Sequence, residues 1–514
     1  MSQADRPGGM NRRQFIKGSL GAAGVSVAFQ GAGREANAAP LAHPSAGERP
    51  NILFAFADDW GAHASALGTA GLHTPTFDRI ASEGVLFENA FLNAPSCTPA
   101  RGTVLTGQYM WRLGPGANLH STLPAELPVY PELLEAHAGY FTGYTRKGWG
   151  PGQLEPGGRE APPTGPQFDD FEVFLESRPG DAPFCFWFGS QDPHRGYSDA
   201  LREEKGVDPD EVEVPPCFPD GPEVRRDIAN YYAEVQRFDR EVGEMLDKLD
   251  EMGELSNTLV VMSSDHGWPF PRGKSNLYDA GTHVPLAIWW PGQMNGGRRV
   301  SDLVTLTDLA PTFLEAAGVD RPAQMTGRSF LGAMLSEREG RVTGYRSFAL
   351  LAKERHHGLC RPRGEGYPSR AIRTKDFLYI RNYEPDRWPV GAPYISSSQD
   401  IFSDTDDGPT KQYMIAHADD PDVAPLFALS FAKRPAEELY DMREDPHQLV
   451  NVAEDAAYEA VKHQLAAMLE DELTAMEDPR MFGEGDKFDE YPYYVGYGME
   501  EVDPPESVKR ALDL

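Results

Sequence analysis

The sequence predicts an α/β fold followed by a smaller α+β region, and the first part rests on two features. Continuous apolar runs at 51–57, 183–188 and 258–262 are typical of strands buried on both faces. Between the second and third runs, residues 224–252 place apolar side chains at helical spacing, which predicts one long amphipathic helix. Alternating strands and helices indicate a sheet covered by helices.

The second region begins near residue 345, where the pattern of the chain changes. Residues 370–382 have the pattern of a β-hairpin, and residues 455–476 have that of a late helix. A smaller α+β domain is therefore expected after the large one. The predicted organisation is a larger α/β domain over 51–345, a smaller domain with an antiparallel sheet over 346–480, and a tail over 481–514 that the pattern does not place.

Two short stretches predict helix starts. Thr74 and Pro75 suit the N-cap and first turn of a helix. In the stretch SCTPARG, Pro99 also suits a first turn, which places Cys97 at or just before a helix N-terminus and Arg101 about one turn along. Such a position favours negative charge, so a thiolate nucleophile is one interpretation of Cys97. That route normally needs a neighbouring histidine base, and none is nearby in sequence.

Composition limits the classes of partner. The 514 residues are 40% hydrophobic and 11% aromatic, which suits a folded protein with a large core. The net charge of −31 argues against nucleic acid or an anionic membrane as a partner. Most of these charges suit a solvated surface. An anionic substrate would therefore need a locally basic site, and the sequence predicts no particular oligomeric state.

The N-terminus has the features of an export signal. The sequence NRRQFIK at 11–17 contains a twin arginine, and a weakly apolar Gly/Ala-rich run follows it. A small-residue cleavage site ends at Ala38. This predicts a twin-arginine signal peptide over 1–38, a linker over 39–50, and a periplasmic or secreted protein. The alternative is a basic amphipathic tail. The apolar run is too short and too glycine-rich to span a bilayer.

The four cysteines are scattered and do not form a disulfide framework. Cys185 lies inside an apolar run and is expected in the core. No spacing typical of a zinc site links Cys97, Cys217 or Cys360 to other ligands. Cys97 alone lies among polar and turn residues, so it is the candidate for chemistry.

Acidic side chains follow two of the predicted strands. Asp58 and Asp59 come after the first, Asp265 and His266 after the third, and His194 follows the second. Ligands gather at the carboxyl ends of strands in α/β folds. Three close carboxylates repel one another unless a cation lies among them, so we expect a divalent ion, Ca²⁺ by preference, with Mg²⁺ or Mn²⁺ open. A single such cluster would more often be turn acids; three together favour a site.

The stretch Cys97-x-Pro99-x-Arg101 resembles the signature of the formylglycine-dependent sulfatases, with Ala100 where serine is commoner. Further segments match in family order, including SSDHG, RGKSNLYDAGTHVPL and LTDLAPTFLEAAGV. The segments QDPHRGY, PFPRGKSNLY and YPSRAIRTKDFLYIRN are similar to the N-sulfoglucosamine sulfohydrolase (heparan N-sulfatase) branch. The resemblance covers roughly residues 50 to 480 and implies an alkaline-phosphatase-like fold, a mixed sheet between helices with a smaller C-terminal domain.

The resemblance also implies roles for named residues. Cys97 would be oxidised to formylglycine by a maturation enzyme, and its hydrate would be both nucleophile and metal ligand. The other metal ligands would be Asp58, Asp59, Asp265 and His266. Arg101 would hold the formylglycine, Lys147 would contact its hydroxyl and the sulfate, and His194 and Lys274 would grip the sulfate and assist the leaving group.

Two features depart from the family or go beyond it. Many relatives carry histidine two residues after the catalytic lysine, where this chain has Trp149, so His120 is a weak candidate for the missing base and a solvated loop residue is the alternative. Residues 354–357, with Arg355 and His356 among them, either line a sugar pocket or form a surface charge cluster.

The expected substrate is a sulfated sugar, first an N-sulfoglucosamine type. An O-sulfatase acting on a sulfated polysaccharide is the alternative. A phosphonate or phosphodiester hydrolase of the same superfamily would share the acids at the strand ends. A carbohydrate-binding protein with an inactive site is the non-enzymatic interpretation, which the absent histidine favours and the intact Cys97 opposes.

Overall fold

The structure is a computed structural model that describes residues 49–344 and 346–514. The predicted export signal over 1–38 and most of the predicted linker lie outside the described residues. The first described strand, β1, spans Asn51–Ala57 and is wholly buried. It forms where the sequence predicted its first strand, because seven consecutive side chains are shielded on both faces of the sheet.

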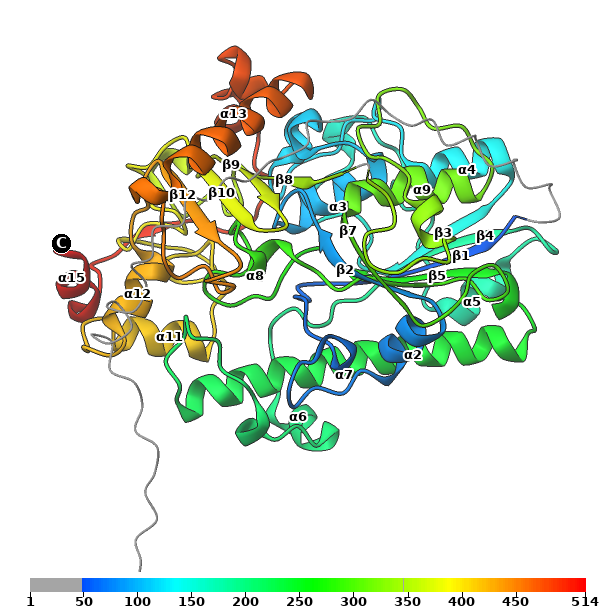
Figure 1. Cartoon of the computed structure of the whole chain (residues 1–514), viewed down its shortest axis with the longest axis horizontal. Helices are drawn as coiled ribbons and strands as arrows, with labels where there is room; N and C mark the ends of the chain where they lie inside the picture. The colour runs from blue at the N-terminus through cyan, green and yellow to red at the C-terminus, as the bar shows by residue number, and fades with distance from the viewer. Residues whose placement is uncertain (1–48, 345) are drawn as a thin grey trace, which may run out of the picture.

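The larger region of the molecule is built around a seven-stranded mixed sheet (Figure 1). β1 is an interior strand, parallel to both of its neighbours, β4 and β5. β6 is antiparallel to the strands on either side of it. The strand order is β3-β4-β1-β5-β6-β2-β7, comprising Phe141–Arg146, Phe184–Gly189, Asn51–Ala57, Thr258–Ser264, Ala287–Trp289, Val85–Phe91 and Arg298–Thr305.

Helices cover both faces of this sheet (Figure 1). Leu53 and Ala55 of β1 join one core cluster, whereas Ile52 and Phe54 join the other, as alternation along a strand requires. The first cluster contains side chains of α2, α5 and α7, and the second contains side chains of α3, α4 and α9. These helices are Pro75–Glu83, Phe171–Ser177, Pro222–Glu251, Cys97–Thr106, Tyr130–Ala138 and Leu309–Ala316.

The long helix α7 confirms the amphipathic pattern predicted for 224–252, with a buried stripe that includes Ile228, Val235 and Val242. The start of α2 differs from its prediction. Thr74 occupies the N-cap position, but its side chain makes no capping bond. The N–H groups of the first turn donate instead to Asp239 of α7, at 2.9 and 2.8 Å. The cap is therefore supplied across the helix–helix contact.

A four-stranded antiparallel sheet forms the smaller region. Its order is β12-β10-β9-β8, comprising Glu437–Asp441, Phe377–Asn382, Ser369–Thr374 and Phe348–Lys353. β9 and β10 confirm the predicted hairpin. Helix α13, Glu459–Ala475, confirms the predicted late helix and packs Leu465 and Leu469 into the cluster that contains Ile372. The predicted fold class, an α/β region with a smaller α+β region, is confirmed.

The tail, which the sequence did not place, is part of the fold. Phe488, in the short helix α14 (Lys487–Glu490), is fully buried in the cluster beneath α13. β13 (Glu500–Glu501) pairs with β11 (Ile395–Ser396). Helix α15 (Glu506–Leu512) packs against α11 (Pro409–Ala416) and α12 (Ala424–Phe431) (Figure 1).

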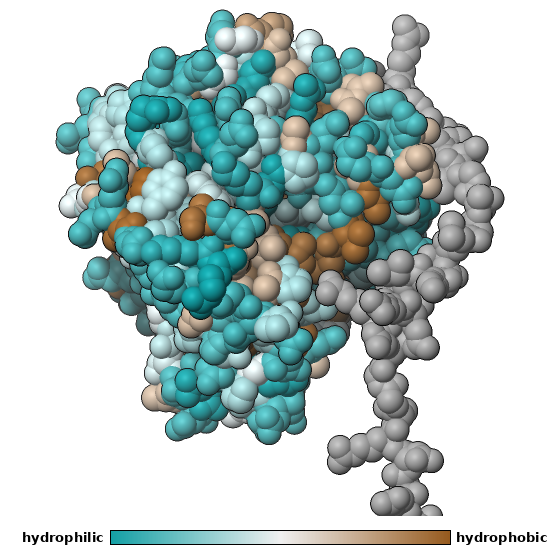
Figure 2. Space-filling view, turned by 90° about the vertical axis from the view of Figure 1, so that its left-hand side faces the viewer, coloured by the Kyte–Doolittle hydropathy of each residue, from teal (hydrophilic) through white to brown (hydrophobic). Residues whose placement is uncertain are grey.

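Figure 2 shows a face that is mostly hydrophilic, with hydrophobic residues in small, separate patches. This suits the solvated surface expected from the net charge of −31. Among the helices of the described residues, none has the length and apolar character needed to cross a membrane.

Candidate active site

Three neighbouring parallel strands end at one edge of the large sheet. Asp58 and Asp59 follow β1, His194 follows β4, and Asp265 and His266 follow β5. The four side chains after β1 and β5 are buried. Because β1 lies between β4 and β5, the side chains that follow these three strands lie close together, as predicted from the sequence.

The backbone at Asp59 adopts an uncommon conformation. Its φ is 73°, in the left-handed region that Asp tolerates better than most residues. Its N–H donates to Asp265 Oδ1 at 3.1 Å. His266 Nε2 lies 3.1 Å from Asp59 Oδ1 and 3.6 Å from Asp265 Oδ1. The turn after β1 is thus fixed by the acid that follows β5.

Cys97 is the first residue of α3, as predicted from Pro99. Its Sγ lies 3.3 Å from His266 Nε2 and 3.9 Å from Asp58 Oδ1. The thiol is buried. A histidine that the sequence places 169 residues away therefore contacts the cysteine, although none is near it along the chain.

Two basic side chains neutralise the acids on this side. Lys147 follows β3, and its Nζ lies 2.6 and 2.5 Å from the two oxygens of Asp58. Arg101 Nε donates to Asp265 Oδ2 at 2.8 Å, and its NH1 donates to the main-chain carbonyls of Lys147 and Gly148, each at 3.0 Å. Arg101 is fully buried, so it fixes Asp265 and the lysine loop together.

On the other side of Asp59, a fourth acid, Asp406, joins the site. Lys274 Nζ donates to Asp59 Oδ2 and to Asp406 Oδ2, both at 2.9 Å. His194 Nε2 lies 3.9 Å from Asp59 Oδ2 and 4.0 Å from Asp406 Oδ2. Asp406 was not among the residues predicted from the sequence. It stands in the acidic stretch SDTDD, and no spacing or motif sets it apart from its neighbours.

The two acids after β1 differ in their electrostatics. Burial would raise the pKa of Asp58, but Lys147 first, then Arg101, hold it well below the ordinary value. Burial raises the pKa of Asp59 despite Lys274. The positive groups around Asp59 thus do not fully offset the cost of burying its carboxylate.

The donor set fits a divalent cation. Ligand atoms of Asp58, Asp59, Cys97 and His266 all lie within 4.8 Å of one another. Asp59 Oδ1 is buried and accepts no hydrogen bond from the described residues. Asp265 stands beside this group, with both oxygens accepting hydrogen bonds. A cation between these ligands would meet the orphaned oxygen and supply the charge that Asp59 lacks.

The residues 354–357 do not form a surface charge cluster, because all four are buried. Glu354 pairs with Arg370 and Arg480. His356 Nδ1 lies 2.8 Å from Oγ of Ser96, the residue before Cys97, which places His356 next to the site. Arg355 instead directs its guanidinium to the tail carbonyls of Asp489, at 3.2 Å, and Tyr491.

His120 is not a freely solvated loop residue. Its ring lies 5.4 Å from Tyr493 and 6.1 Å from Tyr497, and burial first, then neighbouring cations, lower its pKa to about 4. The ring is therefore neutral at pH 7, and its surroundings disfavour protonation. Trp149, where many relatives have histidine, packs against the cluster on the α3 side of the sheet. The role of His120 stays a prediction.

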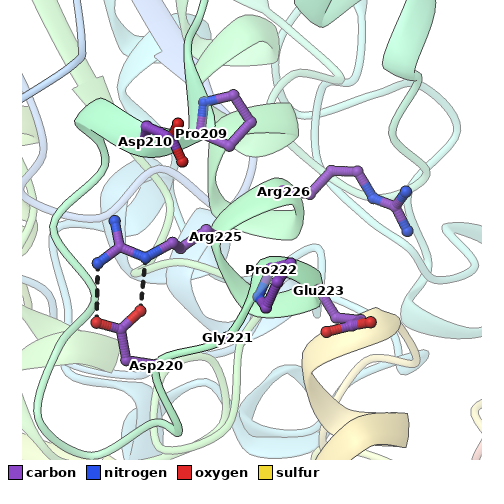
Figure 3. Close-up of a pocket in the computed structure, with 8 residues that line it drawn as sticks. All are labelled: Pro209, Asp210, Asp220, Gly221, Pro222, Glu223, Arg225 and Arg226. Carbon is purple, nitrogen blue, oxygen red and sulfur yellow. Dashed lines mark hydrogen bonds and ion pairs between the residues drawn. The ribbon is translucent and has the colours of Figure 1, made fainter.

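A separate surface pocket of about 400 Å³ lies at the start of α7 (Figure 3). Figure 3 shows Asp220 paired with Arg225, at 2.5 and 2.8 Å. None of the residues at the strand ends lines it. The pocket therefore contains none of the predicted site residues, and the strand-end cluster remains the candidate active site.

Comparison with protein families supports this choice. Residues 50–319 match the family model described as Sulfatase. Residues 264–390 match the one described as N-sulphoglucosamine sulphohydrolase, C-terminal. The first range contains every residue assigned above to catalysis or metal binding, and the second contains Arg355 and His356.

Curated relatives match over most of the chain. The N-sulphoglucosamine sulphohydrolase of Homo sapiens is 29% identical over 474 residues, covering 82% of this chain and 89% of its own. An ulvan-active sulfatase of Formosa agariphila is 27% identical over 476 residues, covering 84% and 76%.

Solved structures show the same fold. A structure described as in complex with its substrate D-glucosamine-2-N,6-O-disulfate aligns with a TM-score of 0.60 at 20% identity, covering 84% of this chain and 98% of that one. A phosphonate monoester hydrolase from Silicibacter pomeroyi aligns with a TM-score of 0.58 at 17% identity, covering 84% and 96%. At such identities the likeness concerns the fold alone. The match to the Sulfatase family, however, spans more than half of the chain and holds the whole strand-end cluster; the chain therefore belongs to the sulfatase family, hydrolases of sulfuric esters and sulfamates.

Proposed function

We propose that this sulfatase removes sulfate from a sulfated sugar of the N-sulfoglucosamine type. The observation that carries the proposal is the placement of Cys97 at the head of α3, 3.3 Å from His266 and among buried acids with one orphaned oxygen. The choice of sugar is supported by the match of residues 264–390 and by the human relative named N-sulphoglucosamine sulphohydrolase.

The cation, Ca²⁺ in our proposal, would be held by Asp58, Asp59, Asp265, His266 and the side chain at position 97. When bound, it polarises sulfate oxygens, and a formylglycine made from Cys97 supplies a hydrated aldehyde as nucleophile. The maturation enzyme that makes formylglycine is thus an implied partner. The export signal predicted over 1–38 supports a periplasmic or extracellular location of the mature enzyme as part of this proposal.

The chain's own residues would bind and orient the sulfate. Lys147 and Lys274 approach the site from opposite sides of Asp58 and Asp59, so their ammonium groups offset the charge on the sulfate oxygens. His194, partly exposed beside Lys274, is placed to donate a proton to the leaving group. Arg101 holds Asp265 rather than facing the substrate. The buried surroundings strengthen each of these interactions.

The test is sulfate release by the full chain co-expressed with a formylglycine-generating enzyme. N-sulfoglucosamine is the substrate, with glucosamine 6-O-sulfate and a phenylphosphonate monoester for comparison. Cys97→Ala is the blank. We expect release from N-sulfoglucosamine that depends on Cys97 and stops when a chelator removes divalent cations.

Other outcomes separate the alternatives. Release from the 6-O-sulfate alone would make the enzyme an O-sulfatase, which relatives such as the N-acetylglucosamine-6-O-sulfatase of Bacteroides thetaiotaomicron would suit. Preference for the phosphonate ester would contradict the proposal at the level of the reaction. Mass spectrometry of the peptide that contains residue 97 shows whether the aldehyde is present.

A further inference from the structure

Asp406 is a buried acid that the proposed reaction does not yet use. It lies in the loop before α11, in the part of the chain that follows the large sheet. Its Oδ2 accepts a hydrogen bond from Lys274 at 2.9 Å, and His194 Nε2 lies 4.0 Å away. A loop from the smaller region thus completes one wall of the candidate active site.

The position of Asp406 relative to Cys97 is informative. Ligand atoms near Asp59 form two close groups, one with Asp58, Cys97 and His266, the other with His194 and Asp406. Asp59 is common to both. In a displacement at sulfur, the attacking and leaving atoms lie on opposite sides. With attack from position 97, the leaving atom is on the side of His194 and Asp406.

One oxygen of Asp406 is uncommitted. Its Oδ1 accepts no hydrogen bond from the described residues. This oxygen is also not one of their completely buried polar atoms without a partner, so it retains some accessible surface. Lys274 uses two of its three N–H donors on Asp59 and Asp406, which leaves one for a sulfate oxygen. The wall therefore offers a donor and a charged acceptor side by side.

A carboxylate beside an anionic sulfate is unfavourable unless it meets a donor. The nitrogen of a sulfamate carries an N–H, whereas the bridging oxygen of a sulfate ester has none. The leaving groups also differ, because a sulfamate yields an amine and a sulfate ester yields an alcohol. In the first reaction, R–NH–SO₃⁻ and water give R–NH₃⁺ and SO₄²⁻, so the S–N bond breaks and the nitrogen becomes cationic. A carboxylate at the leaving atom stabilises that cation and gains less from the O–H of a neutral alcohol.

We propose that Asp406 is a specificity-determining residue that accepts a hydrogen bond from the nitrogen of an N-sulfated sugar and disfavours the corresponding O-sulfate. The inference rests on the proposed function, because that function places the sulfate between Cys97 and Lys274. It assigns the choice between sulfamate and ester to one side chain contributed by the smaller region.

The test compares N-sulfoglucosamine with glucose 2-sulfate, which replaces the N–H by oxygen at the same carbon. Asp406→Asn is expected to lower kcat/KM for the N-sulfate by about 10- to 100-fold, which corresponds to the loss of a hydrogen bond to a charged group. The kcat/KM for glucose 2-sulfate is expected to change far less. Asp407→Asn, which removes an exposed charge one residue on, is the matched control.

The ratio of the two rates on one preparation does not depend on how much protein is folded. An equal fall of kcat/KM for both substrates would leave the ratio unchanged and show that Asp406 only positions Lys274, which would overturn the proposal. No change of kcat/KM for either substrate would overturn it as well.

A binding measurement separates this inference from the proposed function. Calorimetric titration of the Cys97→Ser variant with both sugars is expected to show tighter binding of the N-sulfate and loss of that preference in the Cys97→Ser/Asp406→Asn pair. If the wild type hydrolyses neither sugar but this preference is found and lost, the proposed function fails and the role of Asp406 stands. If no preference is found, the role of Asp406 is contradicted.

Discussion

Lys274 shows how buried charges at the site depend on one another. Its side chain is 4% exposed, and its ammonium group lies between the carboxylates of Asp59 and Asp406, which are also buried. A fully desolvated cation shared by two acids is costly to remove, because both acids remain without a partner. Lys274 is therefore expected to stabilise the site, in addition to the sulfate-binding role that we propose for it.

In protein stripped of divalent cations by a chelator, Lys274→Met is expected to lower the free energy of unfolding by about 3–5 kcal/mol, the typical cost of breaking a buried ion pair. Urea denaturation measures it. Lys487→Met, which breaks the exposed pair with Glu484, is the control and should cost at most about 1 kcal/mol. Equal losses in the two variants would contradict the structural role of Lys274.

Contacts with helix α7 determine how α2 is capped and how the loop before α2 is buried. The first turn of α2 is capped by Asp239 from α7. The loop between β1 and α2 also contacts α7, because the N–H of Gly61 donates to the hydroxyl of Tyr231 at 3.1 Å. In that loop, His63 Nδ1 lies 3.4 Å from the hydroxyl of Tyr231, and its ring lies 4.6 Å from that of Trp268. Burial lowers the pKa of His63 to about 4.

This pKa predicts a pH dependence of stability. Because the folded pKa lies below the ordinary value of about 6.5, the unfolded chain takes up the proton first as the pH falls. The stability due to neutral His63 is complete above pH 6.5 and is lost between pH 6.5 and 4, up to about 3 kcal/mol. Denaturant unfolding at a series of pH values should therefore show a shallower decline for His63→Phe than for the wild type.

His73→Phe, which alters an exposed histidine of the same loop, is the matched control. Parallel curves for wild type and His63→Phe across this range would show that burial of His63 is not linked to folding.

The whole molecule is held together partly by its C-terminal tail. The main chain of the tail accepts hydrogen bonds from Asn118, at 2.7 Å, and from Arg355, and it donates one to His120, at 2.8 Å. The side chain of Phe488 fills the core beneath α13. The tail therefore supports the segment that carries His356, next to Ser96 and Cys97.

Phe488→Ala is expected to cost about 3–5 kcal/mol of unfolding free energy, as large-to-small changes in cores do. Phe482→Ala removes the same atoms from a side chain that is 58% exposed, so its effect should stay within about 0.5 kcal/mol. Thermal and urea unfolding of the two variants give the comparison. A small effect at Phe488 would mean that the tail folds independently of the core.

The sequence by itself determined the large-scale pattern and most of the chemistry. Apolar runs marked β1, β4 and β5, because a strand buried on both faces must be apolar throughout. Acids directly after those runs pointed to one sheet edge, since parallel strands end together. Pro99 placed Cys97 at a helix start, because proline suits the first turn. These inferences needed only neighbours along the chain.

The tertiary structure alone decided the contacts between distant segments. Asp406 approaches Lys274 from 132 residues away, and Asp239 caps α2 from more than 160. The tail lacked any strong periodicity, so nothing in its sequence showed that Phe488 is buried. Local patterns record burial and spacing along an element, whereas these contacts depend on how whole elements pack. The side chain that we propose selects the sulfamate belongs to this second kind.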